Sequence, residues 1–158
     1  MATPMQTAVF FTQLEAEKLL IEKFISLLKE EQLTLVKGGR DELAPVNAAK
    51  TKLVEELAQL SDKRTELMVE SGISLIPQEL TAWIAQQNEK CRALWATCLD
   101  LAKQAKSLNN TNGRLIAERL SNNQAAIQTL MAEANQPATY GRDGQTKTLG
   151  HGRTLGSA

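Results

Sequence analysis

Hydrophobic side chains recur at every third or fourth position along most of this chain, which is the period of an α-helix. Over residues 4–37 they stay on one helical face, which only Glu17 and Glu31 interrupt. The residues of this face are Phe10, Leu14, Ile21, Phe24, Leu28 and Leu35. The pattern predicts a first helix over 4–37.

The ends of this first helix carry recognisable signals. Thr3 is a suitable N-cap, Pro4 fits the first helical position, and Gln6 stands where a capping box requires it. Gly38 and Gly39 follow the last apolar position, and glycine commonly ends a helix. The helix is therefore expected to begin and end at these residues.

A second helix is predicted before the connector 71–76, with Asp41 as its cap. One face of this helix, which we call its seam, has a residue at every third or fourth position without a gap. These residues are Leu43, Val46, Lys50, Leu53, Leu57, Leu60, Arg64 and Leu67. Lys50 and Arg64 interrupt this seam. We expect them to reach outward along their aliphatic stems, and we assign them no chemistry.

A third, longer helix is predicted over 77–134. Pro77 opens it, and its first apolar series is Leu80, Ile84, Cys91, Leu94, Cys98, Leu101, Ala105 and Leu108. Asn-rich sequence around Gly113 favours a break by propensity. The helical spacing nevertheless continues through it, so we predict one unbroken helix, with Gly113 as the place where a kink would form.

The last part of this helix presents a second apolar set, Ile116, Leu120, Ile127, Leu130 and Met131. Such a set is usually buried inside a bundle. The third helix is longer than the first two, however, so its end is also expected to outrun them and to bind another amphipathic helix. The fold class is all-α: an elongated antiparallel three-helix, coiled-coil-like bundle over 1–135.

The remaining segment, 136–158, is rich in glycine and threonine and has only Tyr140, Leu149 and Leu155 as sizeable apolar side chains. So few apolar groups cannot offset the entropy of ordering the backbone, roughly 1–2 kcal/mol per residue. We predict a disordered C-terminal tail that becomes ordered when it binds a partner.

Composition and charge narrow the function. Lys plus Arg and Asp plus Glu number 18 each, so no net field favours nucleic acid or an anionic membrane. No apolar run approaches the roughly 20 residues of a membrane helix, and the N-terminus does not resemble a signal peptide. We expect a cytoplasmic protein without membrane insertion, in which Cys91 and Cys98 are reduced core residues.

Candidate catalytic chemistry is scarce. His151 is the single histidine and stands in the tail without a cluster of ligands or carboxylates around it. Carboxylates such as Glu55 and Glu56 are expected on solvated helix faces. No phosphate-binding glycine loop is found. The sequence therefore predicts a non-enzymatic protein without cofactor or metal, whose function is to hold partners.

Three segments resemble one known family, that of FlgN. They are Leu108–Ile116 (LNNTNGRLI), Asn123–Leu130 (NQAAIQTL) and, most specifically, Tyr140–Thr146 (YGRDGQT). The resemblance extends over nearly the whole chain. It implies a helical, cytosolic chaperone of the flagellar type III export system.

The resemblance also implies partners and sites. Clients would be the C-terminal ends of the hook-filament junction proteins FlgK and FlgL, bound at Ile116, Leu120, Ile127, Leu130 and Met131. The export gate protein FlhA would bind Tyr140, Gly141, Asp143 and Gly144. A second copy of the chain, in a homodimer, is a further possible partner.

Two alternatives stay open at this point. Tyr140 could instead pack back on the end of the bundle. The whole chain could instead be a structural coiled-coil adaptor whose tail is an inert linker.

Overall fold

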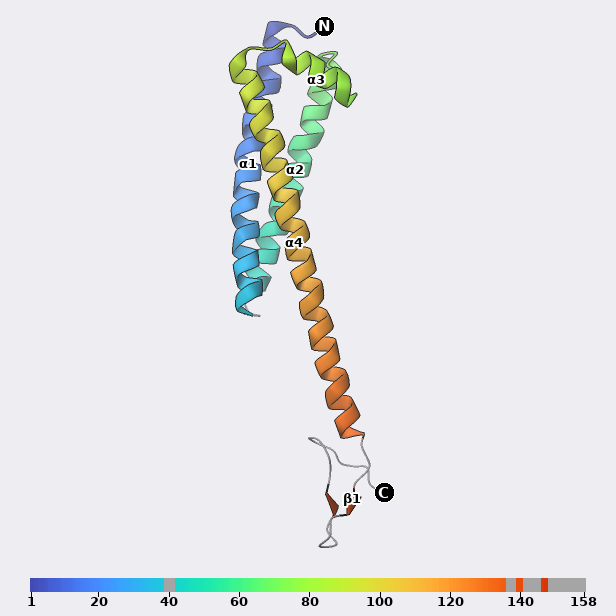
Figure 1. The fold of residues 1–158 in the computed structure, drawn as a ribbon. Coiled ribbons are helices and arrows are strands. Elements are labelled where there is room, and N and C mark those ends of the chain that lie inside the picture. Colours follow the sequence, from blue (N-terminus) through green and yellow to red (C-terminus); the bar gives the residue numbers. More distant parts are fainter. Residues whose placement is uncertain (39–41, 136–138, 141–145, 148–158) are drawn as a thin grey trace. The chain divides into compact units, whose positions relative to one another are not determined.

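The computed structural model describes residues 1–38, 42–135, 139–140 and 146–147 (Figure 1). These residues form α1 (Pro4–Lys37), α2 (Leu43–Glu70), α3 (Pro77–Ala85), α4 (Glu89–Ala134), β1 (Thr139–Tyr140) and β2 (Thr146–Lys147). The chain divides into two compact units, Met1–Gly113 and Arg114–Ala158, and α4 contributes to both. Each unit is considered by itself below.

The ends of α1 are those predicted. The Thr3 side chain accepts the Gln6 N–H at 3.2 Å, and the Gln6 side chain accepts the Thr3 N–H at 2.8 Å, which completes the capping box. At the other end Gly38 adopts the left-handed conformation, with φ +78°. The predicted bounds of the first helix are confirmed.

The end of α2 turns the chain through a Schellman motif. Gly72 adopts φ +66°, its N–H bonds the Val69 carbonyl at 3.2 Å, and the Ile73 N–H bonds the Met68 carbonyl at 2.8 Å. Ile73 is buried, so the connector belongs to the core. At the start of α2, Glu42 is the flanking residue, while the predicted cap Asp41 lies outside the described residues.

The prediction of one helix over 77–134 is wrong at its N-terminal end, where the chain forms α3 and α4. The N–H groups of Gln86 and Gln87 bond carbonyls three residues back rather than four, which tightens the last turn of α3. The Asn88 side chain then accepts the Cys91 N–H at 2.9 Å and caps α4. This local capping stops one helix and starts the next.

Beyond that break α4 is continuous. It passes through Gly113 in helical conformation to Ala134, as the spacing of apolar residues predicts. The apolar series has no member between Ile84 and Cys91, the interval in which the break occurs. Periodicity therefore predicted the continuity through Gly113 correctly but did not predict the break between α3 and α4.

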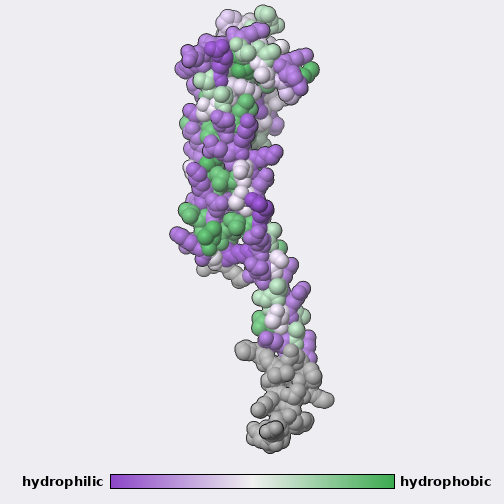
Figure 2. All heavy atoms as spheres, in the orientation of Figure 1, coloured by the Kyte–Doolittle hydropathy of each residue, from purple (hydrophilic) through white to green (hydrophobic). Residues whose placement is uncertain are grey.

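The first unit packs α1, α2 and the first half of α4 around two hydrophobic clusters. Figure 1 shows α1 and α2 side by side and α4 crossing in front of them. One cluster contains Phe10, Phe11, Leu14, Met68, Ile73, Ile84 and Cys98, with Trp83 and Trp95 packed against it. The other contains Ile25, Leu28 and Ala105. On the face seen in Figure 2, hydrophobic atoms gather in small patches among hydrophilic ones.

Hydrogen bonds define the helix directions in this unit. Asn112 bonds the Leu28 carbonyl and Cys98 bonds the Leu14 carbonyl, so α4 runs parallel to α1. Contacts of α1 with Arg64 and Lys50 run in the opposite sense, so α2 is antiparallel to both. The predicted three-helix arrangement is confirmed in part, because α3 is an additional helix.

Lys50 and Arg64 do not reach outward, contrary to the prediction. Arg64 forms an ion pair with Glu17, and Lys50 forms one with Glu31 at 3.2 Å. Both carboxylates are buried. The charges that interrupt the apolar face of α1 thus meet the charges that interrupt the seam of α2, because burying either alone would be costly.

Four residues of the predicted tail are described, and they form a paired structure that the sequence did not predict. Thr139 pairs with Lys147 and Tyr140 pairs with Thr146 in an antiparallel ladder. Residues 136–138, 141–145 and 148–158, also predicted to be disordered, lie outside the described residues.

None of the helices in the described ranges is long and apolar enough to cross a membrane.

Candidate functional site

The candidate client-binding residues all lie on the second half of α4, in the second unit. Each of the five keeps between 42% and 59% of its side-chain surface exposed; they are Ile116, Leu120, Ile127, Leu130 and Met131. Of the two alternatives for this apolar set, burial inside the bundle is therefore wrong. We call these five residues the C-terminal stripe.

Helical geometry places the C-terminal stripe on one face. At 3.6 residues per turn its members fall within an arc about 100° wide, over an axial length of roughly 22 Å. Asn123 lies within this arc, about midway along its length, and divides the stripe into an N-terminal and a C-terminal part. The result is a narrow apolar surface of the kind that another amphipathic helix covers.

Charge is almost absent from this region. Residues 120–132 contain no acidic or basic side chain, and Glu118 and Arg119 lie just before them. The exposed polar groups among them are amides and hydroxyls, such as those of Asn122 and Thr129. A partner would therefore be recognised by apolar contact and neutral hydrogen bonds rather than by long-range electrostatic attraction.

Exposure alone does not single out the C-terminal stripe. Leu19 and Leu33 on α1 are each 60% exposed, and isolated apolar residues on a surface are ordinary. Five of them on one helical face within 16 residues are not. This clustering is the property that makes α4 the candidate site.

The predicted export-gate motif is only partly described. The backbone of Tyr140 pairs with that of Thr146, so the first and last residues of the motif are neighbours in the β1–β2 ladder. Gly141, Asp143 and Gly144 lie outside the described residues. Their assignment, like that of the C-terminal stripe to a client, stays a prediction.

The described residues offer little for catalysis. They contain no group of three or more His, Cys, Asp or Glu side chains that could hold a metal ion. Burial raises the pKa of the Cys98 thiol, which makes the reactive thiolate scarcer. An open groove of about 520 Å³ at the α3–α4 turn is walled by neutral side chains, including Phe11, Trp83 and Gln87.

Comparisons with known proteins identify the family of the chain. A family model described as FlgN protein matches residues 1–148. The Flagella synthesis protein FlgN of Proteus mirabilis is 28% identical over 123 residues, which cover 77% of this chain and 78% of that protein. No solved structure matches. The chain belongs to the FlgN family.

Proposed function

We propose that this chain is a cytoplasmic export chaperone of the flagellar type III system. It binds C-terminal segments of the hook-filament junction proteins FlgK and FlgL, prevents their premature assembly and delivers them to the export gate protein FlhA. Membership of the FlgN family supports a role in building the flagellum. The observation that carries the client site is the exposed C-terminal stripe on α4.

The size of the stripe fits reversible capture. Full burial of a large apolar side chain contributes about 1.5–3 kcal/mol, and about half of each surface is still exposed. Five residues therefore contribute about 4–8 kcal/mol, and an amphipathic client helix contributes a similar amount from its own side. Association costs about 4–15 kcal/mol, so only part of this gain remains as binding free energy, and the complex should dissociate readily.

The test of the client site is the double variant Leu120→Ser, Ile127→Ser. Both side chains are exposed, so the fold of the first unit should be unaffected. Capture of FlgK and FlgL C-terminal fragments should fall at least tenfold, as titration calorimetry with the full-length chain would measure. Undiminished capture by a folded double variant would refute the site.

A matched control lies on α1. Leu19→Ser, Leu33→Ser removes two leucines of similar exposure from outside the C-terminal stripe and should bind clients as the wild type does. Equal losses in both double variants would indicate a general loss of surface hydrophobicity. A wild-type chain that binds neither client would leave the structural adaptor as the better function.

Delivery is proposed to use the Tyr140–Thr146 motif. Pairing of Tyr140 with Thr146 brings the two ends of the motif together, which lowers the entropy cost of presenting it to FlhA. Tyrosine suits such a contact, because its ring fills an apolar pocket while its hydroxyl keeps a hydrogen bond.

Tyr140→Ala should leave FlgK and FlgL binding unchanged and reduce their secretion. Secretion into the culture medium and client pull-down from the same cells measure the two effects separately. Normal secretion, or loss of client binding, would contradict this division of labour. Tyr140→Phe is the matched control, since it keeps the ring and loses only the hydroxyl.

A further inference from the structure

Two ion pairs, each with a buried carboxylate, cross the first unit at regular spacing. Glu17 pairs with Arg64, and Glu31 pairs with Lys50. From one pair to the next, α1 advances by 14 residues and α2 retreats by 14, which is two heptads on each helix. Both pairs therefore belong to a single antiparallel register of α1 against α2.

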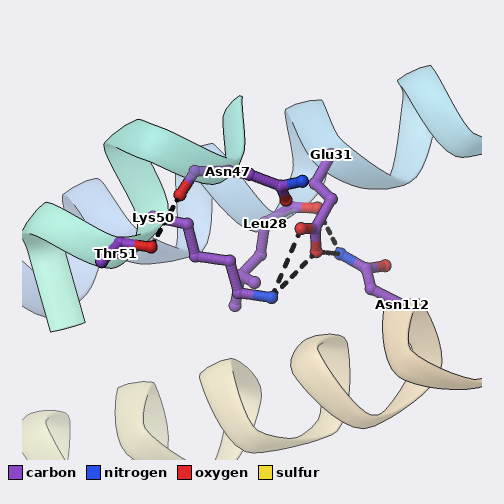
Figure 3. A network of polar contacts seen from close by, with 6 residues as sticks. All are labelled: Leu28, Glu31, Asn47, Lys50, Thr51 and Asn112. Carbon is purple, nitrogen blue, oxygen red and sulfur yellow. Dashed lines mark hydrogen bonds and ion pairs between the residues drawn. The ribbon is translucent and has the colours of Figure 1, made fainter. Parts of the chain in front are cut away.

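The second pair also engages α4 (Figure 3). Lys50 Nζ donates to both Glu31 carboxylate oxygens, at 3.2 and 3.3 Å. Asn112 Nδ2 donates to Glu31 Oε1 at 2.9 Å and to the Leu28 carbonyl at 2.8 Å. Asn112 has no exposed surface and is the last buried residue of α4. One carboxylate thus holds a residue from each of the other two helices.

The apolar pattern of α2 is compatible with more than one register. The seam of α2 is leucine-rich and repeats every heptad, so moving it by seven residues, about 10 Å along the axis, again sets apolar residues against apolar residues. Alternative registers of this kind compete with the native one unless some positions cannot tolerate them.

The charged positions are intolerant of a slip. A shift of one heptad places Arg64 opposite Phe10 in one direction and opposite Phe24 in the other. Glu31 then faces Leu43 or Leu57, without Lys50. Each such shift buries unpaired charge against hydrocarbon, and Asn112 loses its acceptor on Glu31 when α4 shifts.

We propose that these five residues, Glu17, Arg64, Glu31, Lys50 and Asn112, are positioning residues that select one register of the three helices. Their contribution is to uniqueness rather than to stability. A buried ion pair gives about the same stability as well-packed apolar residues of similar size, whereas a single buried polar residue is known to determine register in coiled coils. By fixing Asn112 the cluster also determines at which residue α4 ceases to be buried.

The experiment replaces all five with apolar residues of similar size: Glu17→Leu, Glu31→Leu, Asn112→Leu, Lys50→Met and Arg64→Met. Spin labels at Ser26 and Glu66, both exposed and about 16 Å apart along the axis in this register, report α1 against α2. Labels at Ser26 and Asp100, both exposed and about 15 Å apart along the axis, report α1 against α4. The full chain is used, with Cys91→Ser and Cys98→Ala to leave one label pair.

Wild type should give one narrow distance for each label pair. The apolar variant should stay helical, with unchanged or higher thermal stability, and show additional distances from chains displaced axially by about 10 Å. The charge-swap control Glu17→Arg, Arg64→Glu, Glu31→Lys, Lys50→Glu keeps both ion pairs and should retain the single wild-type distance between α1 and α2. It does not test α4, because a lysine at position 31 cannot accept the hydrogen bond that Asn112 donates.

Two results would overturn the proposal. One is an apolar variant that is folded and gives the same single distances as wild type, since packing alone would then select the register. The other is an apolar variant that does not fold, because the cluster would then be needed for stability itself.

Discussion

Gly38 and Gly113 provide a matched pair of sites at which one substitution should have opposite effects. At both positions a Cβ atom added to the backbone would meet no neighbouring atom within 4 Å. The two glycines differ in conformation, because Gly38 ends α1 at φ +78° whereas Gly113 lies within α4 and has helical geometry. Alanine therefore tests backbone conformation alone.

The expected changes follow from helix propensity and chirality. Gly113→Ala should raise stability by about 1 kcal/mol, because alanine favours a helix over glycine by that amount. Gly38→Ala forces a side chain into the left-handed region at about 1–2 kcal/mol, and the lower entropy of its unfolded chain offsets about 0.4–1 kcal/mol. The two variants should differ by about 2 kcal/mol.

Urea unfolding followed by circular dichroism at 222 nm measures the difference. With a slope of about 1–3 kcal/mol per molar urea, the two midpoints should lie roughly 1 M apart, on opposite sides of wild type. Helix content at zero urea should also rise in Gly113→Ala. A midpoint that falls in both variants would refute the reasoning, since it would show that Gly113 adopts a turn and that α4 is interrupted.

Asn88→Ala removes the cap of α4 and should lower the free energy of unfolding by about 1 kcal/mol in the same urea experiment. The control Asn110→Ala, on the exposed surface of α4, should change it by less than about 0.5 kcal/mol. Burial raises the pKa of Glu17 above its ordinary value of 4.5, against the opposing effects of Arg64 and Gln13. Between the ordinary and the raised pKa of Glu17 the folded state binds more protons than the unfolded state, so this group makes the free energy of unfolding fall as pH rises through that range. Glu17→Gln should remove this contribution. An identical pH dependence of the urea midpoint in wild type and Glu17→Gln would contradict the argument.

Features that depend on local sequence were predictable. The capping box at Thr3, the end of α1 at Gly38 and the continuity of α4 through Gly113 all follow from residues a few positions apart. The break between α3 and α4 was missed because Gln86 and Gln87 suit a helix. The capping ability of Asn88 was the signal for it.

Features that depend on another helix were not predictable in the same way. The direction of Lys50 and Arg64 is set by carboxylates on α1, 19 and 47 residues away in sequence. The sequence shows acidic residues two heptads apart on α1 and basic residues two heptads apart on α2, and the correspondence of these two spacings indicates the ion pairs. The members of the C-terminal stripe were identified from spacing, whereas their exposure required the packed structure. The β1–β2 ladder has strands of two residues, too short for any periodicity.

The aromatic cluster of the first unit determines what the protein's own fluorescence can report. The chain has two tryptophans, and Trp83 and Trp95 both lie near Phe10, with ring centroids 5.4 and 6.5 Å from its ring. Their emission therefore records the loss of this one cluster, whereas far-ultraviolet dichroism also records the helix around Leu120 and Ile127. A difference between the two unfolding curves would measure directly how independently the second half of α4 melts, without any added label.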